Sequence, residues 1–211
     1  MKNKQHSNIL KGVILIIPLL FLCTQARANF MHFHADLSGP NESPANISPG
    51  TGQADVYFDD TAQTMEVVVS FSGLLGTATA SHIHAATALP NTGTAGVATE
   101  TPTFGGFPLG VTSGSYDHWF DLTLAPSFNP AFITANGGTV GSASTAFENA
   151  MLANKTYLNI HTTQFPGGEI RGFLHAVPDT ASTTLLLAIA FGGMVCLARM
   201  RKTSLFGQPS A

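Results

Sequence analysis

Alternation of apolar and polar residues is the feature that most restricts the fold of this chain. Three separate stretches place apolar side chains at every second position: "MHFHADL" (31–37), "QADVYFD" (53–59) and "TMEVVVSF" (64–71). A period of two is typical of a strand that buries one face. Related patterns occur in "YDHWFDLTL", "YLNIHT" and "EIRGFLHA", with Gly-, Pro- and Asn-rich turns between strands. About seven or eight short strands predict an all-β fold, an antiparallel Greek-key β-sandwich.

One segment instead has the period of a helix. In "SASTAFENAMLAN" (142–154), Phe147, Ala150 and Met151 fall on one helical face. Ser142 or Ser144 is the expected N-cap, because a serine hydroxyl can accept from the free N–H groups of the first turn. We therefore expect one short helix beside the strands.

The first 28 residues read as a signal peptide. Lys2, Lys4 and Lys11 precede the apolar run "GVILIIPLLFLC", and Ala26 and Ala28 match the small-x-small rule for cleavage. We expect a signal helix over residues 1–28 with cleavage after Ala28. This predicts an exported protein.

The C-terminal residues 177–202 carry a second targeting pattern. An apolar stretch, 185–198, precedes the basic cluster "RMRK", and a short tail, 203–211, follows it. The simpler interpretation is a hydrophobic transmembrane helix that anchors the protein with its positive charges inside. The alternative begins at Val177, Pro178 and Asp179: "VPDTAST" resembles the VPD variant of the PEP-CTERM class of bacterial sorting signals. That resemblance implies recognition and removal of the tail by an exosortase.

Between these ends, residues 29–176 form one domain of strongly negative charge. Only Lys155 and Arg171 are basic, against eleven Asp and Glu side chains, which leaves a net charge of −9. Such a surface repels nucleic acid and anionic lipid. Both cysteines, Cys23 and Cys196, lie in the terminal apolar segments, so the domain has no disulfide.

The candidate site is a set of histidines on neighbouring predicted strands. His82 and His84 in "TASHIHAATA" are two residues apart and therefore share a strand face, pointing away from the core if Ile83 points into it. His161 in "YLNIHTTQF" has the corresponding position on its strand. If the last strand is adjacent, Glu169 and Arg171 join the same face.

Three imidazoles and a carboxylate suit zinc or copper. Two alternatives remain open. The histidines can be surface residues that hydrogen-bond across the sheet. Glu169 and Arg171 can be structural, with a carboxylate or carbonyl partner that holds the last strand in register.

Three quoted stretches together resemble the CHRD domain, a family named from chordin and widespread in secreted bacterial proteins. They are "FHADLSGPNESP", "GLLGTATASHIHAA" and "YLNIHTTQFPGGEIRGF", and the resemblance covers residues 30–176. It implies a β-sandwich whose biochemistry is largely unassigned, and it does not imply an enzyme.

The order of these motifs is also similar to that of copper–zinc superoxide dismutase. In that family the His-x-His pair and a late histidine bind copper, and a late arginine attracts the anion. The resemblance would place the copper ligands at His82, His84 and His161 and the anion-facing role at Arg171. The chain lacks a bridging-histidine loop, a zinc-ligand cluster and paired cysteines.

These observations favour an exported, non-catalytic binding or structural module of the bacterial envelope or extracellular matrix. Its expected partners are the sorting machinery, the membrane through the C-terminal segment, and extracellular protein or polysaccharide. The alternative is a copper- or zinc-binding protein that uses His82, His84 and His161, with superoxide-dismutase-like activity as its furthest extension.

Overall fold

The computed structural model describes residues 30–178. The predicted signal peptide with its cleavage site at Ala28, the C-terminal hydrophobic segment, Asp179 of the sorting motif and the tail 203–211 lie outside these residues, and remain predictions. Within residues 30–178, no helix is both long enough and apolar enough to cross a membrane.

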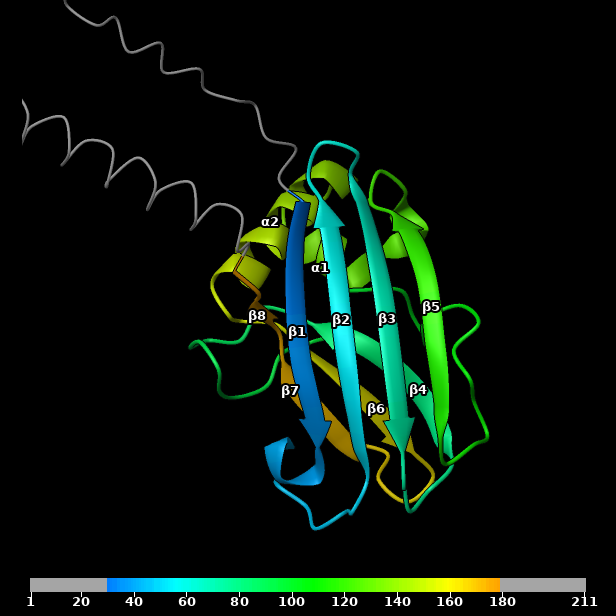
Figure 1. The fold of residues 1–211 in the computed structure, drawn as a ribbon. Coiled ribbons are helices and arrows are strands. Elements are labelled where there is room, and N and C mark those ends of the chain that lie inside the picture. Colours follow the sequence, from blue (N-terminus) through cyan, green and yellow to red (C-terminus); the bar gives the residue numbers. More distant parts are fainter. Residues whose placement is uncertain (1–29, 179–211) are drawn as a thin grey trace, which may run out of the picture.

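Eight strands form one antiparallel sheet (Figure 1). They are β1 (Phe30–Ser38), β2 (Thr51–Asp59), β3 (Thr64–Ser72), β4 (Ala78–His84), β5 (Gly114–Asp121), β6 (Tyr157–Thr162), β7 (Ile170–Phe173) and β8 (His175–Ala176). Their order across the sheet is β4-β6-β7-β1-β2-β3-β5, with β8 also paired to β1. The predicted all-β, antiparallel class is confirmed.

The sheet curls, so that its two halves face each other as the layers of a sandwich. In Figure 1, β4, β6 and β7 cross behind the long strands β1, β2, β3 and β5. The halves meet at β1, which pairs with β2 along its whole length but with β7 only through Ser38 and Arg171. The expected β-sandwich is therefore built from one hydrogen-bonded sheet.

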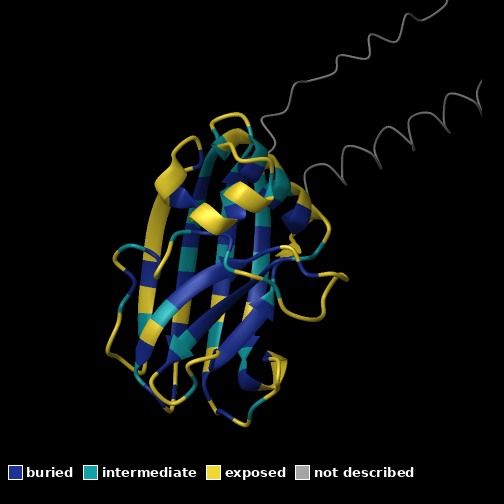
Figure 2. Ribbon diagram, turned by 180° about the vertical axis from the view of Figure 1, so that it is seen from behind, coloured by how far each residue is buried: buried dark blue, intermediate teal, exposed yellow. Residues whose placement is uncertain are grey.

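The core fills the space between the two halves, and the period-two patterns supply it. In β3, Met65, Val67 and Val69 are at most 1% exposed, whereas the residues between them are only partly buried. Figure 2 shows the same banding along the neighbouring strands. Removing each such side chain from water contributes about 1.5–3 kcal/mol to folding, so these patterns dominate the stability of the domain.

Two α-helices cover one end of the sandwich, where one was expected. The expected helix is α2 (Val140–Leu152), and α1 (Pro130–Ala135) precedes it. The predicted N-cap was wrong: Thr139 caps α2, because its hydroxyl accepts from the backbone N–H of Ser142 and the Ser142 hydroxyl accepts from that of Thr139. Asn129 caps α1 in front of a proline at the first helical position. Two short 3₁₀ turns, η1 (Gly39–Asn41) and η2 (Ala125–Ser127), complete the elements.

Candidate metal centre

Strands β4 and β6 bring three histidines together. Each of His82, His84 and His161 offers a ring nitrogen, and these three atoms all lie within 4.8 Å of one another. The register explains the grouping: His82 pairs with Asn159, and His161 pairs with Ala80, so the three rings project from one face of adjacent strands. Among residues 30–178, this is the group of histidine, cysteine and carboxylate side chains with the geometry to hold a metal ion.

Two of the three histidines are buried and His161 is partly buried, which argues against the alternative that they are surface residues. His82 is 6% exposed and His84 is 8% exposed. The long connection between β4 and β5 covers them: Ala98 donates to the carbonyl of Ile83, and Phe104 donates to that of Ser81. The same connection supplies the carbonyls of Pro102 and Ala95 that contact the His82 and His84 rings, so it covers these two side chains.

Each histidine ring is held through one nitrogen by a backbone carbonyl. His82 Nε2 lies 2.5 Å from Pro102 O, His84 Nδ1 lies 2.9 Å from Ala95 O, and His161 Nδ1 lies 2.8 Å from Pro166 O. A carbonyl oxygen only accepts, so each of these nitrogens carries the proton. In a neutral imidazole the other nitrogen then has a free lone pair, as metal-binding histidines have when a backbone carbonyl fixes their tautomer.

Two of these lone-pair nitrogens have no partner. His82 Nδ1 and His161 Nε2 are buried and make no hydrogen bond within the described part of the chain. His84 Nε2 lies 3.1 Å from the side-chain oxygen of Asn159. Two acceptors facing each other repel, so this contact is favourable only when the Asn159 amide is turned to donate its N–H.

Burial keeps all three rings neutral. It lowers the pKa of His84 to about 4, partly offset by the hydrogen bond to Ala95, with further lowering from His82 and His161. Burial also lowers the pKa of His82 and of His161. Neutral imidazoles are the form that binds metals. The site therefore presents three unprotonated nitrogen donors at neutral pH.

Tyr157 and Arg171 support the cluster from one side. The Tyr157 ring stacks on His84 with centroids 4.7 Å apart and planes 6° from parallel. The guanidinium carbon of Arg171 lies 4.7 Å from the centroid of the Tyr157 ring and makes a cation–π contact with it. Arg171 also donates to the carbonyls of Asn41 and Gly93. Its charge is thus engaged by protein groups, which is the structural role considered for it.

Glu169 does not join the histidines, in contrast to the predicted single face. It precedes β7 and is fully buried, where its carboxylate accepts from Ser48 Oγ at 2.5 Å and Thr162 Oγ1 at 2.7 Å. The backbone N–H groups of Leu75 and Gly76 donate to it as well. Burial alone would raise the pKa of Glu169, but these four hydrogen bonds hold it below its usual range. Glu169 is a structural carboxylate and not a fourth ligand.

The remaining histidines lie elsewhere. His32 and His34 both contact Asp55, at 2.7 Å and 2.9 Å, on the outer face of the β1–β2 pair. His118 is exposed on β5, although its ring contacts that of Phe120. It lies on the apolar side of its strand, where the core no longer covers it.

The residues that hold the rings were missed by sequence reasoning. Ala95, Pro102 and Pro166 act through backbone carbonyls, which every residue has, so no side-chain pattern marks them. Asn159 did carry a signal, since it alternates with His161 on the same strand face.

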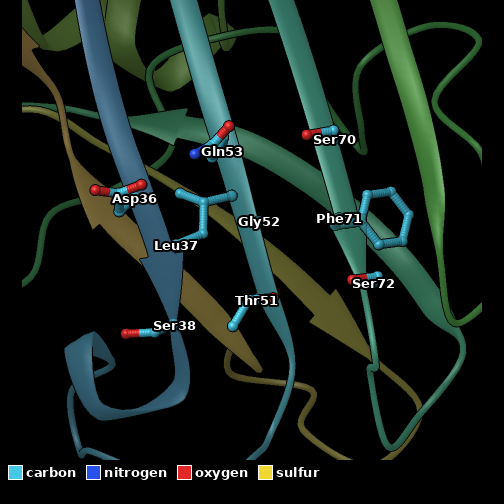
Figure 3. Close-up of a pocket in the computed structure, with 9 residues that line it drawn as sticks. All are labelled: Asp36, Leu37, Ser38, Thr51, Gly52, Gln53, Ser70, Phe71 and Ser72. Atoms are coloured by element: carbon cyan, nitrogen blue, oxygen red, sulfur yellow. The ribbon is translucent and has the colours of Figure 1, made fainter.

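A separate groove of about 510 Å³ crosses β1, β2 and β3 (Figure 3). The side chains on its outer side are hydroxyls, one amide and one carboxylate: Ser38, Thr51, Ser70, Ser72, Gln53 and Asp36. It contains none of the candidate histidines. Leu37, Gly52 and Phe71 complete its lining, and Asp36 is its charged side chain.

Comparison with known proteins gives one match. No curated protein and no solved structure was found to be similar to the chain. The family model of the CHRD domain matches residues 33–174, well over half of the 211 residues and nearly all of the described ones. The match contains every strand that carries a candidate ligand, and the chain therefore belongs to the CHRD domain family.

Proposed function

We propose that this protein is an exported, non-catalytic module whose CHRD domain binds copper or zinc through His82, His84 and His161. One observation carries the proposal. Each ring has one nitrogen fixed by a backbone carbonyl, while the second nitrogen of His82 and of His161 is buried without a partner among residues 30–178.

The energetics of burial favour an occupant of this kind. A buried polar atom without a hydrogen bond costs about 1–3 kcal/mol, so native proteins rarely keep two side by side. A hydrogen-bond donor would satisfy one lone pair, but a metal ion satisfies several that converge. Copper and zinc both accept imidazole ligands. The cluster consists of histidines alone, so its ligand types are compatible with either metal.

The geometry fits with a small adjustment. Nitrogen ligands lie about 2.0–2.1 Å from zinc, so ligand atoms up to 4.8 Å apart must move inward when the ion binds. Asn159 would release His84 in that movement. Three protein ligands leave one tetrahedral position for solvent or for a group from a partner.

Holding a metal is better supported than dismutation. A domain with a net charge of −9 opposes the approach of superoxide, whereas dismutases attract it. Arg171, the residue with the expected anion-facing role, is only 5% exposed and already donates to two carbonyls. We therefore propose metal handling or a structural metal.

Elemental analysis of the purified chain after exposure to copper or zinc and removal of the excess tests the proposal. We expect about one equivalent retained by the wild type and by His118→Ala, which changes a histidine outside the cluster. His84→Ala and His161→Ala should lose the metal while keeping the far-ultraviolet circular dichroism of the wild type. If the folded wild type retains no stoichiometric metal, the proposed site is refuted.

A second function, binding of extracellular polysaccharide, is favoured by the groove in Figure 3. Four of its side chains are hydroxyls and one is an amide, which are groups that exchange hydrogen bonds readily with sugar hydroxyls. Gln53 on β2, the central of the three strands, is the residue to change. If Gln53→Ala weakens retention on a matrix polysaccharide while metal content is unaffected, the two functions are separate.

The proposal includes export of the protein and its attachment or release at the membrane, which depend on the two terminal segments. We infer that residues 1–28 direct export and that the segment beginning at Val177, Pro178 and Asp179 is processed by an exosortase or retained as an anchor. Mass spectrometry of the mature protein distinguishes these fates. An N-terminus at Asn29 supports export, and loss of residues after the motif supports processing.

A further inference from the structure

A second cavity lies between two loops at the end of the sandwich away from the helices. Residues 42–46, which follow η1, and residues 164–168, which join β6 to β7, enclose about 340 Å³. This volume is at the lower end of the range of small-molecule sites, about 300–1,000 Å³. The cavity contains none of the three histidines, although Pro166, whose carbonyl holds the His161 ring, is among its lining residues.

Glu42 is the charged side chain of this cavity. It is 8% exposed, and its Oε1 atom makes no hydrogen bond within the described residues. The other oxygen, Oε2, lies 3.7 Å from Arg171 Nε, which is beyond hydrogen-bond distance. Gly168 also lines the cavity, and an added Cβ there would overlap Glu42 Oε1, so this oxygen packs directly behind the Gly168 backbone.

Two of the side-chain donors near Glu42 are committed to other acceptors, while the backbone N–H of Ser43 acts on the Glu42 carboxylate itself. Arg171 donates to the carbonyls of Asn41 and Gly93. The side-chain amide of Asn46 donates to the carbonyls of Gly168 and Glu169. Within the described residues Glu42 Oε1 thus has no hydrogen bond, and a buried carboxylate oxygen without a donor is costly.

We propose that this cavity binds a small organic ammonium group, whose N–H donates to Glu42 Oε1 while its carbon chain contacts Pro44, Phe165 and Pro166. Glu42 is the only carboxylate among the lining residues, and the remaining walls are largely apolar. The net charge of −9 draws cations to the domain and disfavours anions. A terminal amine on an alkyl chain, such as a lysine side chain or a simple amine, has this chemistry.

The protonation of Glu42 makes the binding dependent on pH. Burial raises the pKa of Glu42 to about 7, although Arg171 on β7 acts to lower it. The other titratable group that acts electrostatically with it is the Tyr157 phenol on β6, whose pKa is raised by burial, so it stays neutral. An ammonium ion binds the ionised carboxylate, so affinity should rise between pH 6 and pH 8.

Titration of the full chain with butylammonium chloride, followed by NMR shifts of the Gly167 and Gly168 amides, tests the proposal. Saturable binding that is at least threefold tighter at pH 8 than at pH 6 is expected, with butanol binding at least tenfold more weakly. Glu42→Gln keeps the size of the side chain and removes its charge, and it should weaken butylammonium binding at least tenfold.

A second variant keeps the proposal testable if Glu42→Gln fails to fold. Ala45→Trp narrows the cavity without changing Glu42, and it should also weaken binding. Equal binding of butanol and butylammonium, or unchanged binding in folded Glu42→Gln or Ala45→Trp, would overturn the proposal. His84→Ala should keep butylammonium binding and lose metal. The ammonium proposal and the metal proposal can therefore fail separately.

Discussion

The rings of Tyr157 and His84 lie parallel, with centroids 4.7 Å apart, so the orientation of one histidine depends on its neighbour along the sheet. His84 and Tyr157 are directly paired across β4 and β6, which brings their side chains into contact. The phenol oxygen of Tyr157 also lies 3.3 Å from Ala95 O, the carbonyl that holds His84 Nδ1. One side chain thus supports both the ring and its hydrogen-bond partner.

Replacing Tyr157 should therefore weaken metal binding without removing a ligand. Groups that orient metal-binding histidines typically affect affinity by about 10–100-fold. We expect Tyr157→Leu to reduce copper or zinc affinity by about tenfold, and Tyr157→Phe, which keeps the stacked ring, to reduce it less. Competition with a chelator of known affinity measures the difference, and equal affinities in Tyr157→Leu and the wild type would show that stacking has no part in the site.

The metal-free domain should lose stability as the pH falls from about 6.5 to about 4. The folded pKa of His84 is about 4, below its ordinary value of 6.5, so the unfolded chain binds a proton that the folded chain excludes in this interval. At one pKa unit per 1.36 kcal/mol, the loss reaches about 3 kcal/mol. Burial lowers the pKa of His82 and of His161 as well, so both residues contribute to stability in the same direction.

Chemical denaturation at several pH values, with chelator present, measures this loss. His84→Gln lacks the titrating ring, so its free energy of unfolding should fall less steeply than that of the wild type between pH 6.5 and pH 4. His118→Ala is the matched control and should follow the wild-type slope, because His118 is exposed. Parallel curves for His84→Gln and the wild type would contradict the shifted pKa.

The strands were predictable because their signal is carried by side chains. In β3 the residues Met65, Val67 and Val69 alternate with polar or partly buried positions, and the structure buries these three. The same rule placed His82 and His84 on one face. Alternation depends only on local backbone geometry, so it is readable without knowledge of the partner strands.

The burial of the site was not predictable by the same reasoning. The connection after β4 covers the histidines through backbone bonds, such as Phe104 N–H to Ser81 O, and these leave no mark in side-chain patterns. The carboxylates were misleading for a related reason. Glu169 follows Gly168, whose φ of 128° redirects the chain, so simple alternation failed to place its side chain. Glu42 lies in "PNESP", which reads as an exposed turn, yet the structure buries it.

Glu169 should be among the most sensitive positions for stability. Its carboxylate accepts four hydrogen bonds, two of them from the backbone of the segment between β3 and β4. Removing it leaves these buried donors unpaired, at about 1–3 kcal/mol each before relaxation. We expect Glu169→Ala to lower the free energy of unfolding by at least about 3 kcal/mol in urea denaturation. Glu66→Ala, on the outer face of β3, should change it by less than about 1 kcal/mol, and similar losses in both variants would remove the special role of Glu169.

Two glycines should respond to alanine in opposite directions. Gly172 lies in β7, where an added Cβ would overlap the backbone carbonyl of Asp36 in β1, so the strands that join the two halves of the sheet would have to separate. Backbone cannot move aside as a flexible side chain can, and we expect Gly172→Ala to destabilise the domain by about 2 kcal/mol or more.

Gly141 is in the first turn of α2 and has open space at its Cβ position. Alanine there should stabilise the domain by about 0.5–1 kcal/mol, because glycine loses more conformational freedom in a helix. Thermal unfolding of both variants beside the wild type checks the two signs, and a stable Gly172→Ala would mean that β1 and β7 approach less closely than described.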